Sequence, residues 1–250
     1  MALAGCAARR LELPGDAGAP FPDYAETHRQ VTMTCAGVRT MTAELALSGR
    51  AGGRGMRGRA IAGFERPASM RLEGVAPFGP PAFILAARGG AATLVLPRDN
   101  RVLREGPAED ILGALTGVAL APADLQAILT GCVVAESGAA GGRLHQNGWV
   151  SIDLSGRATL FLERVEGAWR PRAASRPGWQ IEYASWQGGF PQTVRLRSLD
   201  AAVDVDLTAA VSQRETNVPL DPAAFTVAVP PGALELTLDE LREAGPLRAP

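Results

Sequence analysis

The sequence predicts a mainly β protein with a few short helices, organised as one antiparallel domain over residues 21–250. Apolar and polar residues alternate with a period of two from Thr42 onward and again across residues 144–207, which is typical of strands that bury one face. Turn-forming pairs such as Ser155-Gly156 divide these runs into strand-length pieces. A chain of 250 residues is long enough to bury an ample core.

A helix is predicted to begin after Asp23, because Glu26 follows three residues later in a capping-box arrangement. Apolar residues then recur at steps of three and four and form one buried stripe. We expect His28 to be a core histidine of this stripe and not a catalyst. The stripe consists of Tyr24, His28, Val31, Cys35 and Val38.

A meander of strands follows this helix. Residues 53–58 match the G-x-G-x-x-G spacing of dinucleotide-binding loops, but they lead into the strand-like residues 59–64. A dinucleotide-binding loop must open a helix, so we interpret this segment as a hairpin turn. Two further strands, Phe83 to Ala87 and Ala92 to Leu96, flank another turn.

An apolar, proline-rich loop over residues 75–81 interrupts the meander. Prolines keep it out of a regular ladder, and a buried loop would leave backbone groups unsatisfied. Pro77, Phe78 and Gly79 therefore either form a hydrophobic tip at the surface that contacts lipid, or Phe78 folds back onto the core.

Two short helices are predicted over residues 108–115 and 122–130, ended by Gly117 and Gly131. Without its breaks, the stretch from residue 111 to 135 has the length of a membrane span. Pro122 and Asp124 lie at its centre, and a central Asp costs about 2.5 to 3.5 kcal/mol on insertion scales. Two helices that cover a sheet are the better interpretation.

The C-terminal half is predicted to return to strands. Residues 136–142 are expected to form a loop, and Arg195 and Arg197 are expected to share an outer sheet face with Asp204 and Asp206. A last strand is expected around residues 225–229, followed by a short helix capped by Thr237 and Glu240.

The N-terminus contains a sequence with the form of a bacterial lipobox, Leu3-Ala4-Gly5-Cys6. Only five residues precede Cys6, so the apolar segment of a signal peptide is missing. We expect Cys6 to carry a lipid anchor and residues 1–20 to be the lipobox remnant and a flexible tether.

Composition and cysteine content narrow the classes of function. Hydrophobic residues make up 46% of the chain and the net charge is −1, which does not indicate disorder or nucleic-acid binding. Cys35 and Cys132 either pair as a disulfide in an oxidising periplasm or remain two buried thiols. His28 and His145 show no ligand spacing, so no metal site is predicted.

The order of these elements resembles the LolB family of outer-membrane lipoprotein receptors and the wider LolA/LolB-like group. The resemblance covers residues 24–233. It is carried by the lipobox, the N-terminal helix, the P-F-G loop, the helical segment E-D-I-L-G-A-L-T-G-V-A-L-A-P-A-D-L-Q-A-I-L-T-G, the strand W-Q-I-E-Y-A-S-W-Q-G-G-F and the closing F-T-V-A-V-P-P-G-A.

The resemblance implies an unclosed antiparallel β-barrel with an apolar concave side, and short helices that cover this side. It also implies a monomer on the periplasmic face of the outer membrane that takes an acylated lipoprotein or lipid from a LolA-like carrier, without a cofactor. Pro77-Phe78-Gly79 occupies the place of the family's membrane-delivery loop, where the family has leucine.

The inward-facing apolar residues are candidates for an acyl-chain cavity, although ordinary core packing explains each equally well. An envelope scaffold with a filled core and a lipid hydrolase are the alternatives. No G-x-S-x-G motif occurs, and His145 has no recognisable Ser and Asp context in sequence, so we expect no enzyme. The cavity candidates are Leu45, Leu47, Ile61, Met70, Leu72, Phe83, Leu85, Leu94, Trp179 and Ile181.

Overall fold

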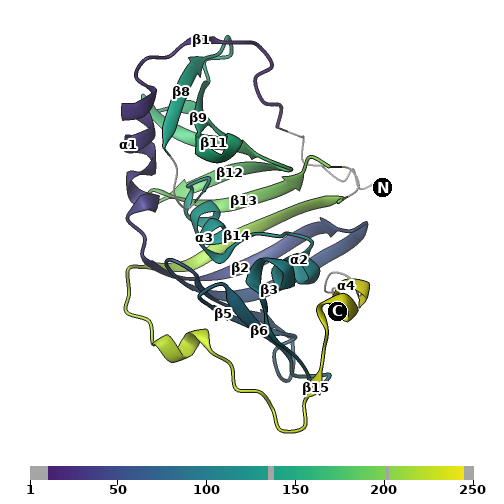
Figure 1. The fold of residues 1–250 in the computed structure, drawn as a ribbon. Coiled ribbons are helices and arrows are strands. Elements are labelled where there is room, and N and C mark those ends of the chain that lie inside the picture. Colours follow the sequence, from purple (N-terminus) through teal and green to yellow (C-terminus); the bar gives the residue numbers. More distant parts are fainter. Residues whose placement is uncertain (1–10, 135–137, 201–202, 245–250) are drawn as a thin grey trace, which may run out of the picture.

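The computed structural model of the protein describes residues 11–134, 138–200 and 203–244. The strands of these residues form a single sheet in the order β1-β8-β9-β10-β11-β12-β13-β14-β2-β3-β4-β5-β6-β7-β15. β1 and β15 end this order and do not pair with each other, so the sheet is a curved, unclosed barrel (Figure 1). The predicted fold class is confirmed.

The strands are antiparallel to their neighbours, except that β15 runs parallel to β7. Their bounds are β1 Ala19–Pro20, β2 Thr40–Ala51, β3 Arg54–Glu65, β4 Ser69–Val75, β5 Ile84–Arg88, β6 Ala91–Leu96, β7 Arg101–Pro107, β8 Ala139–Leu144, β9 Val150–Leu154, β10 Ala158–Val165, β11 Ala168–Arg176, β12 Trp179–Gln187, β13 Phe190–Ser198, β14 Val205–Thr216 and β15 Leu234–Glu235.

Four α-helices lie among the described residues: α1 Tyr24–Ala36, α2 Ala108–Thr116, α3 Pro122–Thr130 and α4 Leu238–Ala244. α2 contacts β6 and β7, and α3 contacts β3, β4 and β13. Both therefore cover the concave face of the sheet, while α1 lies beside β8 and β11 (Figure 1). No helix of the described residues is long and apolar enough to cross a membrane.

Glycines end both covering helices where the sequence predicts. Gly117 and Gly131 adopt left-handed conformations, with φ of 76° and 95°. A side chain at either position would be strained in this conformation. The left-handed residue turns the chain away from the helix axis, which keeps α2 and α3 short enough to fit within the curve of the sheet.

Three local predictions are wrong. Asp23 makes no side-chain cap on α1, because Glu26 pairs with Arg29 and Gln30 instead of closing the capping box. Residues 139–142 belong to β8, not to a loop. Residues 225–229 form no strand; Pro222–Phe225 is a 3₁₀ turn, η2, that buries Phe225 against β4 and β5.

The segment over residues 11–20 is not a free tether. The side-chain amide of Gln180 donates to the carbonyl oxygen of Leu11 at 3.1 Å, and β1 pairs with β8. This segment therefore crosses the outer side of the sheet and covers its β8 edge. Cys6 and the lipobox lie outside the described residues.

Candidate functional site

An apolar cavity lies between the concave face of the sheet and the two covering helices. Its volume is about 100 Å³. Among the side chains that line it, only that of Thr116 is polar. The lining consists of Leu45, Leu47, Ala60, Leu72, Phe83, Leu112, Thr116, Val118, Leu120, Leu125, Ile128, Leu129, Val194, Leu196, Leu207 and Ala209.

The period-two pattern and a few small side chains together produce this cavity. Alternate residues of β2, β3, β13 and β14 point to the concave side, and Ala60 and Ala209 leave space there that larger side chains would fill. Leu47, Thr116, Leu125 and Ala209 are only partly buried, so they mark the mouth of the cavity. The mouth therefore lies between the helices α2 and α3 on one side and the strands β2 and β14 on the other.

Four of the ten cavity candidates, Leu45, Leu47, Leu72 and Phe83, line the cavity. Others pack in the core away from it: Met70, Leu85, Leu94 and Ile181 are fully buried, and Trp179 is partly buried against the same core.

The prediction for Ile61 is wrong, because this side chain is 51% exposed on the outer face. On β3 the buried positions are Ala60, Ala62 and Phe64. Small alanines carry the inward face here, so the size of an apolar side chain does not indicate which face of β3 is buried. The lining residues of β13 and β14 were recognisable from their alternation, but those of α2 and α3 become apparent only once the helices are docked.

The loop between β4 and β5 presents Phe78 to solvent, with 88% of the residue exposed. Its backbone is nevertheless held in place. The guanidinium group of Arg98 donates to the carbonyl oxygens of Phe78 at 2.8 Å and of Pro80 at 3.4 Å. Pro77 and Gly79 are exposed beside it. Of the two alternatives for Phe78, the structure shows the exposed one.

Covalent and buried polar contacts fix the end of α3. Cys35 and Cys132 form a disulfide that joins α1 to the second residue after α3, which decides between the two cysteine alternatives. The buried hydroxyl of Tyr183 donates to the carbonyl oxygen of Cys132 at 2.9 Å. Complete burial raises the pKa of this hydroxyl, so it stays protonated and remains a donor.

Two arginines add to this anchorage. Arg176 donates to a carboxylate oxygen of Asp124 at 2.7 Å, in the first turn of α3. Arg214 donates to the carbonyl oxygen of Leu129 at 3.3 Å and lies over the ring of Phe190. Burial lowers the pKa of Arg214 to about 10, which leaves it charged at neutral pH. Its charge complements the C-terminal end of the α3 dipole.

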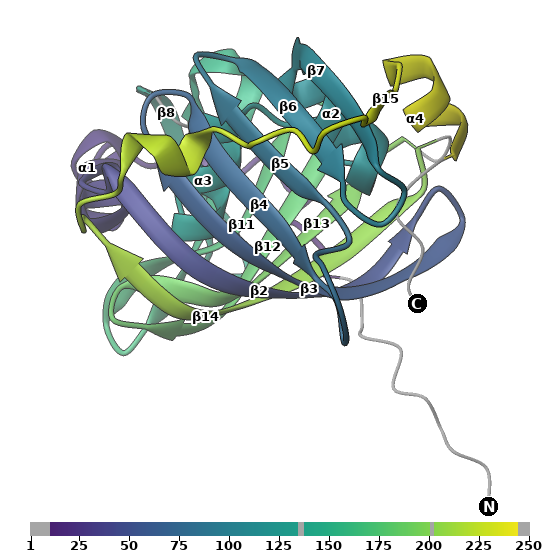
Figure 2. The same ribbon diagram turned by 90° about the horizontal axis from the view of Figure 1, so that it is seen from below.

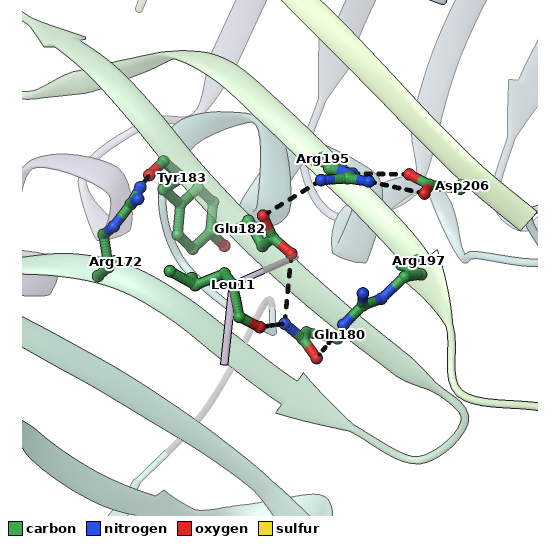
Figure 3. Close-up of polar contacts among 8 residues, drawn as sticks. All are labelled: Leu11, Arg172, Gln180, Glu182, Tyr183, Arg195, Arg197 and Asp206. Carbon is green, nitrogen blue, oxygen red and sulfur yellow. Dashed lines mark hydrogen bonds and ion pairs between the residues drawn. The ribbon is translucent and has the colours of Figure 1, made fainter. Parts of the chain in front are cut away.

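The outer face of β12–β14 carries a network of polar side chains (Figure 3). Arg195 donates two hydrogen bonds of 2.7 Å to Asp206, as the charge pattern predicts, whereas Arg197 donates to Gln180. The hydrogen bond from Arg195 holds the pKa of Asp206 below its ordinary value. Gln180 links this network to Leu11, so the network fastens the N-terminal segment.

His145 lies between a serine and an aspartate that are distant in sequence. Its Nε2 is 2.9 Å from Oγ of Ser151, and its Nδ1 is 3.3 Å from Oδ1 of Asp16. These spacings resemble a hydrolase triad. Ser151 is only 6% exposed, and Asp16 belongs to the segment that crosses this face. The group therefore serves to attach residues 11–20, and it does not offer an accessible nucleophile.

Among the described residues, no group of three or more His, Cys, Asp or Glu side chains gathers as a metal site. The polar network of Figure 3 lies on the outer face of the sheet, whereas the side chains that line the cavity on the concave side are apolar apart from that of Thr116. The chemistry of the cavity is thus suited to an apolar ligand.

A curved, unclosed antiparallel sheet with helices on its concave face is the LolA-like fold. A LolA superfamily protein from Nitrosomonas europaea aligns with 80% of this chain and 97% of its own length, with a TM-score of 0.53 and 10% identity. A DUF1329 family protein from Desulfovibrio piger aligns with 82% of this chain and 98% of its own, with a TM-score of 0.52 and 12% identity. No protein-family model matches the chain, and no curated protein matches its sequence.

Proposed function

We propose that this protein is a non-catalytic carrier or receptor of acylated molecules in the bacterial cell envelope. The apolar cavity beneath α2 and α3 is the observation that carries the proposal. Burial of acyl chains contributes about 0.8 kcal/mol per CH₂ group. An apolar site can therefore hold the lipid part of a lipoprotein, which water excludes, without any covalent chemistry.

The cavity must enlarge to accept such a ligand. Its volume of about 100 Å³ is smaller than the roughly 150 Å³ of an engineered cavity that binds benzene. The mouth lies beside the covering helices, so we infer that a helix moves away from the sheet when an acyl chain enters. In this proposal the structure represents the closed state of the carrier.

We further propose that the cargo is a lipoprotein or lipid received from a LolA-like carrier, and that release occurs at the periplasmic face of the outer membrane. Cys6 would anchor the protein, which would act as a monomer, and Phe78 would contact the bilayer during release. The support is the sequence resemblance together with the exposure of Phe78 on a loop whose backbone Arg98 holds.

Cargo binding is tested with the Cys6→Ser protein purified from the periplasm. Native mass spectrometry with extraction of bound lipid should reveal a stoichiometric acylated ligand, and the protein should take up a fluorescent fatty acid. Ala209→Phe places a ring in the cavity and should abolish uptake. Ala210→Phe, the adjacent and exposed position of β14, is the matched control.

The small volume of the cavity favours one alternative, an envelope scaffold with a filled core. If native mass spectrometry shows the protein without a ligand, and the protein with the unsubstituted cavity takes up no fluorescent fatty acid, the scaffold is established and the carrier function is removed.

The loop is tested separately by transfer of the fluorescent fatty acid from the protein to phospholipid vesicles. Phe78→Glu should slow transfer while uptake and stability remain unchanged, because the side chain contacts solvent and not the core. Leu199→Glu, at another exposed apolar position in the bend that follows β13, is the control. Equal transfer by both variants would remove the loop from the mechanism.

A further inference from the structure

The C-terminal arm, residues 217–244, passes from the outer side of the sheet to its concave side. It first crosses the outer face of β4 and β5 (Figure 2), where Arg71 donates to the carbonyl oxygens of Ala224 and Thr226, each at 2.9 Å. It then reaches the β7 edge of the sheet. There the backbone NH of Leu236 donates to the carbonyl oxygen of Val102 at 2.7 Å.

Beyond this edge the arm ends in α4, which contacts α2 (Figure 1). Leu241 of α4 is 4% exposed and belongs to the same core cluster as the cavity-lining residue Leu112 of α2. Arg242 lies 3.9 Å from a carboxylate oxygen of Asp110, in the first turn of α2. Arg101 of β7 pairs with Glu240 at 2.9 Å. The arm thus connects α2 to the edge of the sheet.

Of the two covering helices, α2 carries fewer strong fastenings than α3. Leu112 and Thr116 of α2 line the cavity, so its displacement would widen this space. Its sequence contains no cysteine, whereas α3 is fastened by a disulfide and by the buried bond from Tyr183. α4 packs against α2 and would have to separate from it before α2 could leave the sheet.

We propose that the C-terminal arm is a latch: α4 holds α2 over the cavity, and release of α4 opens the cavity to an acyl chain. The role in ligand entry rests on the proposed carrier function. The mechanical coupling between α4 and α2 does not depend on that function, and it can be measured without a ligand.

The latch is locked by cross-linking α4 to α2. In a Cys6→Ser background, Asp110→Cys with Arg242→Cys is joined by a short bismaleimide, which should slow uptake of the fluorescent fatty acid about tenfold. Arg50→Cys with Asp204→Cys is the matched control. It replaces another ion pair, of 3.5 Å, which joins β2 to the residue just before the neighbouring strand β14. Equal rates in the two cross-linked proteins would overturn the latch.

The latch is released by Leu241→Ala. Amide hydrogen exchange of α2 should become about tenfold faster while that of α3 is unchanged. Leu154→Ala, a buried leucine of β9 with 5% exposure, controls for general destabilisation. Unchanged exchange in α2, or equal acceleration in α2 and α3, would contradict the latch. A protein that shows the selective exchange but takes up no fatty acid would retain the latch and lose the carrier function.

Discussion

The two helices over the concave face have similar lengths and both line the cavity, yet they are held in different ways. α3 is fastened at its end by the Cys35–Cys132 disulfide and by the buried hydroxyl of Tyr183. α2 is held by apolar packing, by its first backbone NH, of Ala108, which donates to the carbonyl oxygen of Gly90 at 3.0 Å, and by the pair between Asp110 and Arg242 of α4. Apolar contacts have little directionality and re-form after movement, whereas a disulfide does not. We infer that α3 is the fixed part of the cover and α2 the movable part.

Removal of the disulfide should have the largest effect on this difference. The bond joins residues 97 apart in sequence, and loss of a native disulfide that closes a long loop costs about 2–4 kcal/mol. Cys35→Ala with Cys132→Ala should lower the free energy of unfolding by that amount in chemical denaturation. Amide exchange should accelerate in α3 more than in α2. A double variant with wild-type stability would show that α3 does not depend on this anchor.

Tyr183→Phe should have the next largest effect. It keeps the buried ring and removes the hydroxyl that donates to the carbonyl oxygen of Cys132. A buried carbonyl that loses its partner costs about 1–3 kcal/mol. Thermal unfolding should register this loss, and hydrogen exchange should place it at the end of α3. Equal exchange changes in both helices would mean that Tyr183 supports the whole core and not α3 in particular.

A smaller effect, on α2, is expected from Thr237→Ala. The Thr237 hydroxyl accepts from the backbone NH of Glu240 at 3.2 Å, and the Glu240 carboxylate accepts from the backbone NH of Thr237 at 2.8 Å. Loss of such a cap costs about 1 kcal/mol. The rate of amide hydrogen exchange should rise in α4 and α2 and should stay unchanged in α3. Thr237→Ser, which retains the hydroxyl, should restore the wild-type pattern.

The smallest expected effect is a dependence of the free energy of unfolding on pH that arises from His28. This residue lies on α1, the helix that also carries Cys35 of the disulfide. Burial lowers the pKa of His28, and Nε2 of its ring is buried without a hydrogen bond. Below the unfolded pKa of about 6.5, the unfolded chain binds more protons at this site than the folded one does. Stability should therefore fall as the pH drops from 6.5 towards the lowered pKa.

His28→Gln should reduce this dependence in urea titrations at pH 7 and pH 5 and leave His145 in place. If the free energy of unfolding of the variant changes between pH 7 and pH 5 as much as that of the wild type does, the pH dependence comes from other groups.

Local sequence determined most of the elements that this protein contains, although not β8 or the turn η2. The change from a period of three and four to a period of two separates α1 from β2, and Gly117 and Gly131 end their helices because a left-handed residue is required there. Exposure of Phe78 was one of two alternatives. The prolines of the loop that carries Phe78 exclude regular strand pairing, but they do not show whether the ring of Phe78 returns to the core.

Only the tertiary structure decided the features that depend on residues distant in sequence. The disulfide requires α1 and α3 to dock with their Cα atoms 5.8 Å apart. The cavity exists because α2, α3 and the sheet leave space over Ala60 and Ala209. The predicted burial of Ile61 is wrong because β3 turns its alanines to the inner face and Ile61 to the outer face. Sequence periodicity specifies the faces of each element, but a void is a property of the fit between surfaces, which no single segment specifies.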